Sequence, residues 1–128
     1  PFGFGLSYSR FEYSDLKVSP DRLSGTSEVS VSFTVKNTGD RDGDEVVQLY
    51  VKHLDSRVER PLKELKGFRR VTVTAGKKET VKIPLKGVSL SWWDATQNGW
   101  RVEEGRLLVM IGASSADIRL ETVLTVVP

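Results

Sequence analysis

The sequence predicts an all-β fold in which two antiparallel sheets enclose one core. Three observations support this prediction. Apolar residues alternate with polar ones over short runs, the runs recur at intervals of roughly 8–12 residues, and glycine or asparagine stands in most of the gaps between them. No segment sustains helical periodicity, so at most a single helical turn is expected, around residues 88–90.

The clearest strand covers residues 28–36, where three valines and a phenylalanine alternate with polar side chains. One face of this strand is therefore expected in the core and the other in solvent. The alternation places on the inner faces of the two sheets Val31, Phe33, Leu49, Val109 and Ile111. The other strands, about seven in all, are expected over residues 11–18, 45–53, 65–74, 79–85, 101–102 with 107–111, and 118–127.

Turn chemistry separates these strands. Residues 37–40, 75–77, 97–99 and 104–105 contain glycine or asparagine, where a positive φ angle is expected. Short connections of this kind indicate an antiparallel sandwich of immunoglobulin or fibronectin type III shape. The Cys-Trp-Cys pattern of antibody domains is not found, because the chain has no cysteine.

Composition limits the possible function classes. A length of 128 residues suits one domain with one core, and no run approaches the ~20 apolar residues of a membrane span. The net charge of +2 gives no reason to expect a nucleic-acid partner. Without cysteine there is no disulfide framework, no thiolate nucleophile and no sulfur-ligated zinc. Neither a cofactor nor a metal is expected.

Acidic clusters supply no convincing catalytic or metal site. A glycosidase needs two carboxyl groups about 5–9.5 Å apart across a cleft, whereas Asp42, Asp44, Glu103 and Glu104 fall in expected turns. Residues 40–45 do not fit a calcium loop either, because position twelve of that loop would be Val51; a charged hairpin turn explains them. His53 is interpreted as a strand-end residue with a local hydrogen bond. No catalytic residue is assigned.

Three tryptophans, Trp92, Trp93 and Trp100, fall within nine positions and leave two interpretations open. As candidate carbohydrate contacts, their faces would stack on sugar rings. Alternatively, one ring lies in the core and another against a neighbouring domain. Adjacent strand residues point to opposite faces, so only one member of the adjacent pair can join a given platform.

The first ten residues differ in kind from the rest. Glycine and aromatic residues are interleaved, and exposed rings in a cluster usually indicate a missing partner surface. Residues 1–10 are therefore expected to form an interdomain tether, and residues 11–128 the folded domain. A run of basic residues, which ends at Arg70, is expected to pair in part with carboxylates at a domain boundary. The expected interdomain contacts are Phe2, Phe4, Leu6, Tyr8, Arg57 and Arg60.

Four segments carry a resemblance to a known family: PFGFGLSY at residues 1–8, EVVQLYV at 45–51, RPLKELKGF at 60–68 and GASSADI at 112–118. Together they resemble the C-terminal fibronectin type III-like domain of glycoside hydrolase family 3 enzymes, the β-glucosidases and β-xylosidases. The resemblance covers essentially the whole chain. It implies that the catalytic carboxylates lie in upstream domains, that the tether packs between domains, and that Leu65 and Phe68 go to the core. A secreted or periplasmic location is compatible with it.

These observations favour a non-catalytic accessory domain of a family 3 glycoside hydrolase, in a parent enzyme that hydrolyses β-linked glucosides or xylosides. Its partners would be the upstream catalytic domains of the same polypeptide and, in the second interpretation, an oligosaccharide. The alternative function is an autonomous carbohydrate-binding module that uses surface tryptophans. A cell-surface interaction module is a more remote third. The aromatic tether favours the first, because a free module has no use for exposed rings before its first strand.

Overall fold

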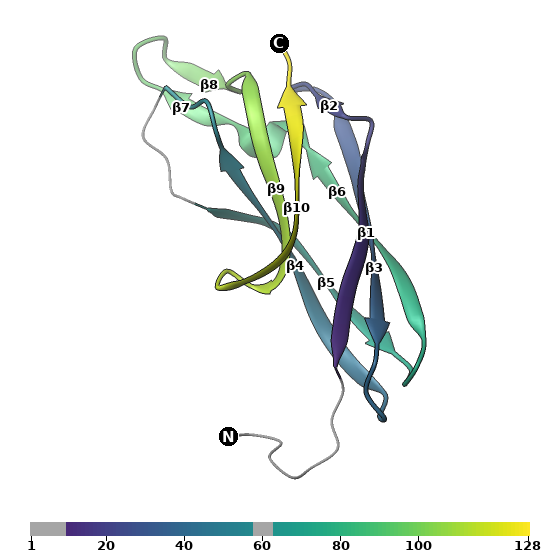
Figure 1. Cartoon of the computed structure of the whole chain (residues 1–128). Coiled ribbons are helices and arrows are strands. Elements are labelled where there is room, and N and C mark those ends of the chain that lie inside the picture. The colour runs from purple at the N-terminus through teal and green to yellow at the C-terminus, as the bar shows by residue number, and fades with distance from the viewer. Residues whose placement is uncertain (1–9, 58–62) are drawn as a thin grey trace.

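A computed structural model describes residues 10–57 and 63–128 (Figure 1). Within them the element order is β1 (Phe11–Ser19), β2 (Arg22–Leu23), β3 (Glu28–Asn37), β4 (Gly43–His53), β5 (Glu64–Val73), β6 (Lys78–Lys86), the 3₁₀ turn η1 (Gly87–Leu90), β7 (Trp92–Asp94), β8 (Gly99–Arg101), β9 (Gly105–Ser114) and β10 (Asp117–Val126). No helix in this part of the chain has the length and apolar character needed to cross a membrane.

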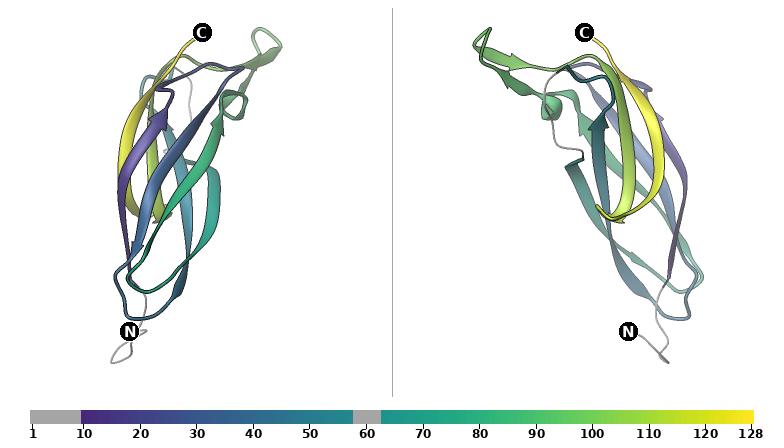
Figure 2. Two further views of the ribbon diagram at one scale, coloured as in Figure 1. Left: turned by 90° about the vertical axis from the view of Figure 1, so that its right-hand side faces the viewer. Right: turned by 60° about the vertical axis from the view of Figure 1, so that its left-hand side comes forward.

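The long strands form two layers. One sheet has the order β1-β3-β6 and the other the order β2-β10-β9-β4-β5. The two sheets lie face to face, and the small β7–β8 hairpin extends from the end of the sandwich at which β10 ends (Figures 1 and 2). This is the all-β sandwich that the alternation predicts, and the expected seven strands are the seven long ones.

Three short strands were not expected. β7 and β8 pair with each other, and β2 pairs with β10 in parallel, a local exception to the antiparallel prediction. β2 has two residues and β7 and β8 have three each. Strands this short carry too little alternation to be recognised in a sequence.

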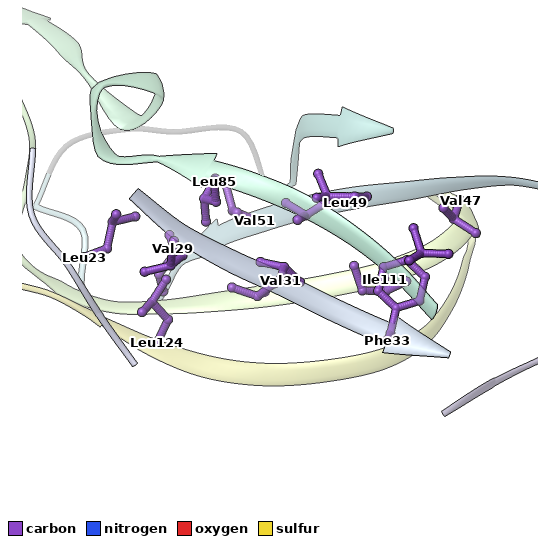
Figure 3. Packing of buried hydrophobic residues seen from close by; sticks show 14 of the residues in the cluster. Leu23, Val29, Val31, Phe33, Val47, Leu49, Val51, Leu85, Ile111 and Leu124 are labelled. Atoms are coloured by element: carbon purple, nitrogen blue, oxygen red, sulfur yellow. The ribbon is translucent and has the colours of Figure 1, made fainter. Parts of the chain in front are cut away.

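The core lies between the sheets and confirms the predicted strand phase. Along β3, every second residue from Val29 to Asn37 is buried. The five side chains that alternation assigned to the interior are all at most 1% exposed: Val31, Phe33, Leu49, Val109 and Ile111. Figure 3 shows the side chains of β3 packed together with those of β4, β6, β9 and β10, among them Leu49, Leu85, Ile111 and Leu124. Burial of each such side chain stabilises the fold by roughly 1.5–3 kcal/mol.

Most of the predicted turns have the expected backbone. Gly76, Asn98 and Gly105 adopt positive φ angles of 75°, 51° and 138°. The connection from Asn37 to Gly43 does not, and it is no hairpin, because β3 and β4 lie in different sheets. A buried amide holds it instead.

Asn37 is fully buried at the end of β3. Its Nδ2 donates to the carbonyl oxygens of Arg41 at 2.7 Å and Val73 at 2.9 Å, and its Oδ1 accepts from Gly39 N at 2.9 Å. The amide thus ties the crossing connection to β5 of the other sheet. Because each polar group of this side chain has a partner, its burial carries no desolvation penalty of an unpaired group.

The prediction that Leu65 and Phe68 go to the core is wrong. They are 52% and 62% exposed on the outer face of the five-stranded sheet. Phe68 lies opposite Gln48 and Leu65 opposite Tyr50, so they share a face with residues that alternate with the inward Leu49. The register shift skips Lys66, and this bulge brings two residues three apart onto the same face.

Candidate functional site

The tryptophans divide between the two faces of the β7–β8 hairpin. Trp92 pairs with Arg101 on one face, and Trp93 pairs with Trp100 on the other. Trp92 is half-buried, whereas Trp93 is 48% and Trp100 68% exposed. The two exposed indoles are in T-shaped contact, with ring centroids 5.5 Å apart and planes at 75°. The structure therefore brings together two of the three predicted carbohydrate contacts.

Asp94 holds the hairpin in shape. Its Oδ1 accepts hydrogen bonds from the Thr96 backbone N–H at 3.0 Å and from Thr96 Oγ1 at 2.6 Å, and its Oδ2 lies 3.2 Å from Arg101 Nε. The hydrogen bond from the Thr96 hydroxyl, together with Arg101, holds the pKa of Asp94 below its usual value. The turn is closed by Asn98 in the left-handed region, which asparagine tolerates better than most residues. The hairpin that carries the two indoles is therefore fixed by its own contacts between Asp94, Thr96 and Arg101.

Trp92 lines a hollow on the opposite side of the hairpin, beside a group of charged residues. The other lining residues are Asp55, Arg57, Arg101, Val102, Glu103, Glu104 and Gly105. Glu103 accepts hydrogen bonds from Ser56 Oγ at 2.8 Å and from the Arg57 backbone N–H at 2.7 Å. Arg57, an expected interdomain contact, is itself exposed at this rim.

Asp55 is bound to Arg106 by three hydrogen bonds. The backbone N–H and Nε of Arg106 donate to Oδ2 at 2.8 and 3.1 Å, and Nη2 donates to Oδ1 at 2.9 Å. Donation from the Arg106 side chain, and then from its backbone, lowers the pKa of Asp55 to about 2. A general acid of a glycosidase needs a raised pKa instead. The geometry of this hollow therefore supports a structural role for Asp55.

Three of the four acidic residues of the 40–45 segment are engaged separately. Asp42 accepts from the Ala75 backbone N–H at 2.9 Å, Asp44 pairs with Arg70 at 2.7 Å and with Thr72, and Glu45 accepts from Tyr13 OH at 3.0 Å. Hydrogen bonds from Thr72 and Arg70 lower the pKa of Asp44. Within residues 10–57 and 63–128, no three histidine or acidic side chains converge in a way that could hold a metal ion.

The sequence analysis missed the contacts of Tyr13, which stacks on a ring of its own sheet and reaches Arg119 and Glu45 of the other sheet. Tyr13 of β1 stacks on Phe33 with centroids 6.1 Å apart, and Arg119 of β10 lies 4.8 Å above the Tyr13 ring. Burial, followed by the nearby Glu45 carboxylate, raises the pKa of Tyr13 far above its usual value. Alternation of Phe11 and Tyr13 could have indicated an inward tyrosine, but its partners Phe33, Glu45 and Arg119 lie 20 or more positions away in the sequence.

The remaining predicted contacts cannot be placed. Phe2, Phe4, Leu6, Tyr8 and Arg60 lie outside the described residues. His53 ends β4 and is half-buried, in agreement with its interpretation as a strand-end residue.

Comparison with known proteins identifies the class that this sandwich represents. Residues 45–115 match the model of the fibronectin type III-like domain family. The chain belongs to this family. It is 46% identical over 121 residues to the thermostable β-glucosidase B of Acetivibrio thermocellus, and 43% identical over 119 residues to a putative β-xylosidase of Formosa agariphila; the alignments cover 94% and 93% of this chain. The crystal structure of a GH3 β-glucosidase from Bifidobacterium adolescentis superposes with a TM-score of 0.83 at 40% identity over 98% of the chain.

The relatives are much longer than this chain. The alignments span 16% of each of the two enzymes named above and 18% of the solved structure. The matches confirm the resemblance to the fibronectin type III-like domain of family 3 glycoside hydrolases. They also confirm that the chain by itself corresponds to a non-catalytic part of such an enzyme.

Proposed function

We propose that the chain is an accessory domain of a family 3 enzyme that hydrolyses β-linked glucosides, and that it packs on the upstream catalytic domains of the same polypeptide. One observation carries the proposal: 94% of this chain aligns with only 16% of a β-glucosidase. The similarity to a putative β-xylosidase supports a second candidate, a parent enzyme that acts on β-xylosides. The tether of residues 1–10 would run along the contact.

The outer face of the five-stranded sheet is a suitable docking surface. Four of its apolar side chains are 40–62% exposed: Val46, Leu65, Phe68 and Val123. We name this set the outer apolar face. Leu65 and Phe68 are brought to one side of β5 by a bulge, and bulges re-aim side chains at functional edges. Large apolar side chains gathered on one exposed sheet face often mark a contact with another protein surface.

The occupant of the outer apolar face would be the upstream part of the parent polypeptide, which accounts for most of the length of the relatives. Interfaces between domains resemble protein–protein interfaces, in which a few large side chains at the centre carry most of the binding energy. Phe68 fits this role, because it is the largest side chain of the face and 62% exposed. Arg57 and Arg60 would contribute charged contacts to the upstream part.

The test separates the chain from the upstream part and measures binding between the two. The 128-residue chain alone should not hydrolyse p-nitrophenyl β-glucoside or β-xyloside. It should bind the separately expressed upstream part, and Phe68→Asp should weaken this binding at least tenfold. Val88→Asp is the matched control, since Val88 is equally exposed at 63% but lies on η1. Hydrolysis by the chain alone, lost on substitution of its own acidic residues, would refute the proposal.

A further inference from the structure

The face of the β7–β8 hairpin that carries Trp93 and Trp100 is not needed to complete the core. The buried cluster closes with side chains of β2–β6, η1, β9 and β10, without either indole. The hairpin extends beyond the sandwich (Figure 2), and its shape is set by Asp94 and Arg101 on the opposite side. Two large rings held in place yet exposed to solvent form a preorganised contact surface, which reduces the entropic cost of binding.

A shallow hollow adjoins Trp100. It is lined by Ser24, Gly25, Thr26, Ser91, Trp100, Arg101, Val102, Val127 and Pro128. Three of the lining residues carry hydroxyl groups: Ser24 Oγ and Thr26 Oγ1 lie 3.3 Å apart, and Ser91 Oγ donates to the Val88 carbonyl at 2.7 Å. Each hydroxyl offers one donor and two acceptor positions, so these groups keep capacity for a ligand.

The charge of this hollow favours a neutral ligand. No Asp or Glu side chain belongs to its lining, and its one cationic side chain, Arg101, is paired with Asp94. A polyanion would find no further positive charge among the lining residues, and an acidic or basic peptide would find no complementary partner. Aromatic faces combined with a few polar groups are the usual composition of small-molecule sites. Pyranose rings match both features, because they present C–H groups to an electron-rich ring and hydroxyls around their edge.

We propose that Trp93, Trp100 and the adjoining hydroxyl-lined hollow form a binding site for the neutral pyranose units of an oligosaccharide. A sugar unit would stack on the Trp100 indole, and the Trp93 ring would stand at 75° to it. The hydroxyls of Ser24, Thr26 and Ser91 would accept hydrogen bonds from the sugar edge, and whichever of Ser24 and Thr26 does not donate to the other would also donate to the sugar. The site lies on a different element from the outer apolar face, so it does not depend on how the domain docks.

Titration of the 128-residue chain with cellohexaose and with xylohexaose, followed by calorimetry and tryptophan fluorescence, tests the site. Saturable binding with a Kd of about 1 mM or tighter is expected for at least one of them. Trp100→Ala should weaken it at least tenfold and Trp93→Ala severalfold. Phe68→Ala, which removes an exposed ring elsewhere, should leave it unchanged. Urea midpoints check that each variant is folded; Trp100→Leu, which keeps apolar bulk without an indole face, replaces Trp100→Ala if that variant unfolds.

Two results would overturn the proposal. One is the absence of saturable binding of both oligosaccharides up to about 10 mM. The other is binding that persists in the folded Trp93→Ala/Trp100→Ala double variant. If sugar binding is absent and addition of the upstream part protects both indoles from N-bromosuccinimide, the hairpin is a domain contact instead. Failure here leaves the docking experiment on Phe68 unaffected, so the two proposals fail separately.

Discussion

β3 and β5 are strands of equal length with opposite relations to the core. Phe33 of β3 is 1% exposed, whereas Phe68 of β5 is 62% exposed. β3 is the central strand of its sheet. It pairs with β1 on one side and, in continuous register, with β6 on the other. β5 is an edge strand, and its pairing with β4 contains a bulge. The comparison teaches that residue type alone does not decide burial. The register of a strand and its place in the sheet decide which phenylalanine stabilises the domain and which is left for a partner.

The largest loss of stability is expected for the buried phenylalanine, Phe33. Phe33→Ala should lower the free energy of unfolding by about 3–5 kcal/mol, because it removes a fully buried ring that also stacks on Tyr13. Urea denaturation of the 128-residue chain measures it. Phe33→Leu, which keeps most of the volume, should lose clearly less. An unchanged urea midpoint for Phe33→Ala would contradict the inward placement of β3.

A second variant probes how the central strand is tied to the edge strand. Asn37→Ala should destabilise the chain by about 1–3 kcal/mol, because it leaves the carbonyl oxygens of Arg41 and Val73 without their buried donor. The exposed neighbour Thr38 supplies the control Thr38→Ala, for which a change within about 0.5 kcal/mol is expected. Equal urea midpoints for both variants would rule out a structural role for the Asn37 amide.

A pH series extends the comparison to the surface. The pKa of Asp55 is lowered to about 2 in the folded chain, so the stabilisation from its pairing with Arg106 is present above pH 4 and is lost as pH falls towards 2. Asp55→Asn should therefore be less stable than the parent chain at pH 6, and the difference between their urea midpoints should close between pH 4 and pH 2. A difference independent of pH would mean that the ion pair does not contribute.

The smallest change in stability is expected for the exposed phenylalanine, Phe68. Phe68→Ala should change the stability of the isolated chain by no more than about 0.5 kcal/mol. The ring is already 62% exposed to water, so its removal takes away little buried apolar surface. The same substitution should destabilise the parent polypeptide if the outer apolar face is covered there. Thermal unfolding of both forms makes the comparison. A large loss in the isolated chain would place Phe68 in the core after all.

Local pattern was sufficient for most of the fold. Each of the seven long strands was expected within two residues of its observed bounds, apart from β9, which ends three residues later than expected. The expected extension over residues 101–102 is wrong, because Arg101 ends β8 and Val102 lies in no strand. The positive φ angles at Gly76, Asn98 and Gly105 were also anticipated. These features depend on neighbours in the chain, so alternation and turn chemistry are enough to predict them. The candidate site was only partly foreseen: the sequence selected the three tryptophans but could not pair them.

By itself, the sequence determined the fold class, the inward face of β3 and the family to which the chain belongs, because periodicity and local motifs encode these properties directly. Only the tertiary structure decided that Trp93 faces Trp100, that Asn37 reaches Val73 36 positions away, and that Leu65 and Phe68 point outwards. Each of these depends on which strands become neighbours and in what register. The bulge skips one residue, Lys66, and so turns the β5 residues before it to the opposite face of the sheet. A shift of one residue in the pairing cannot be recognised from the alternation of a short strand.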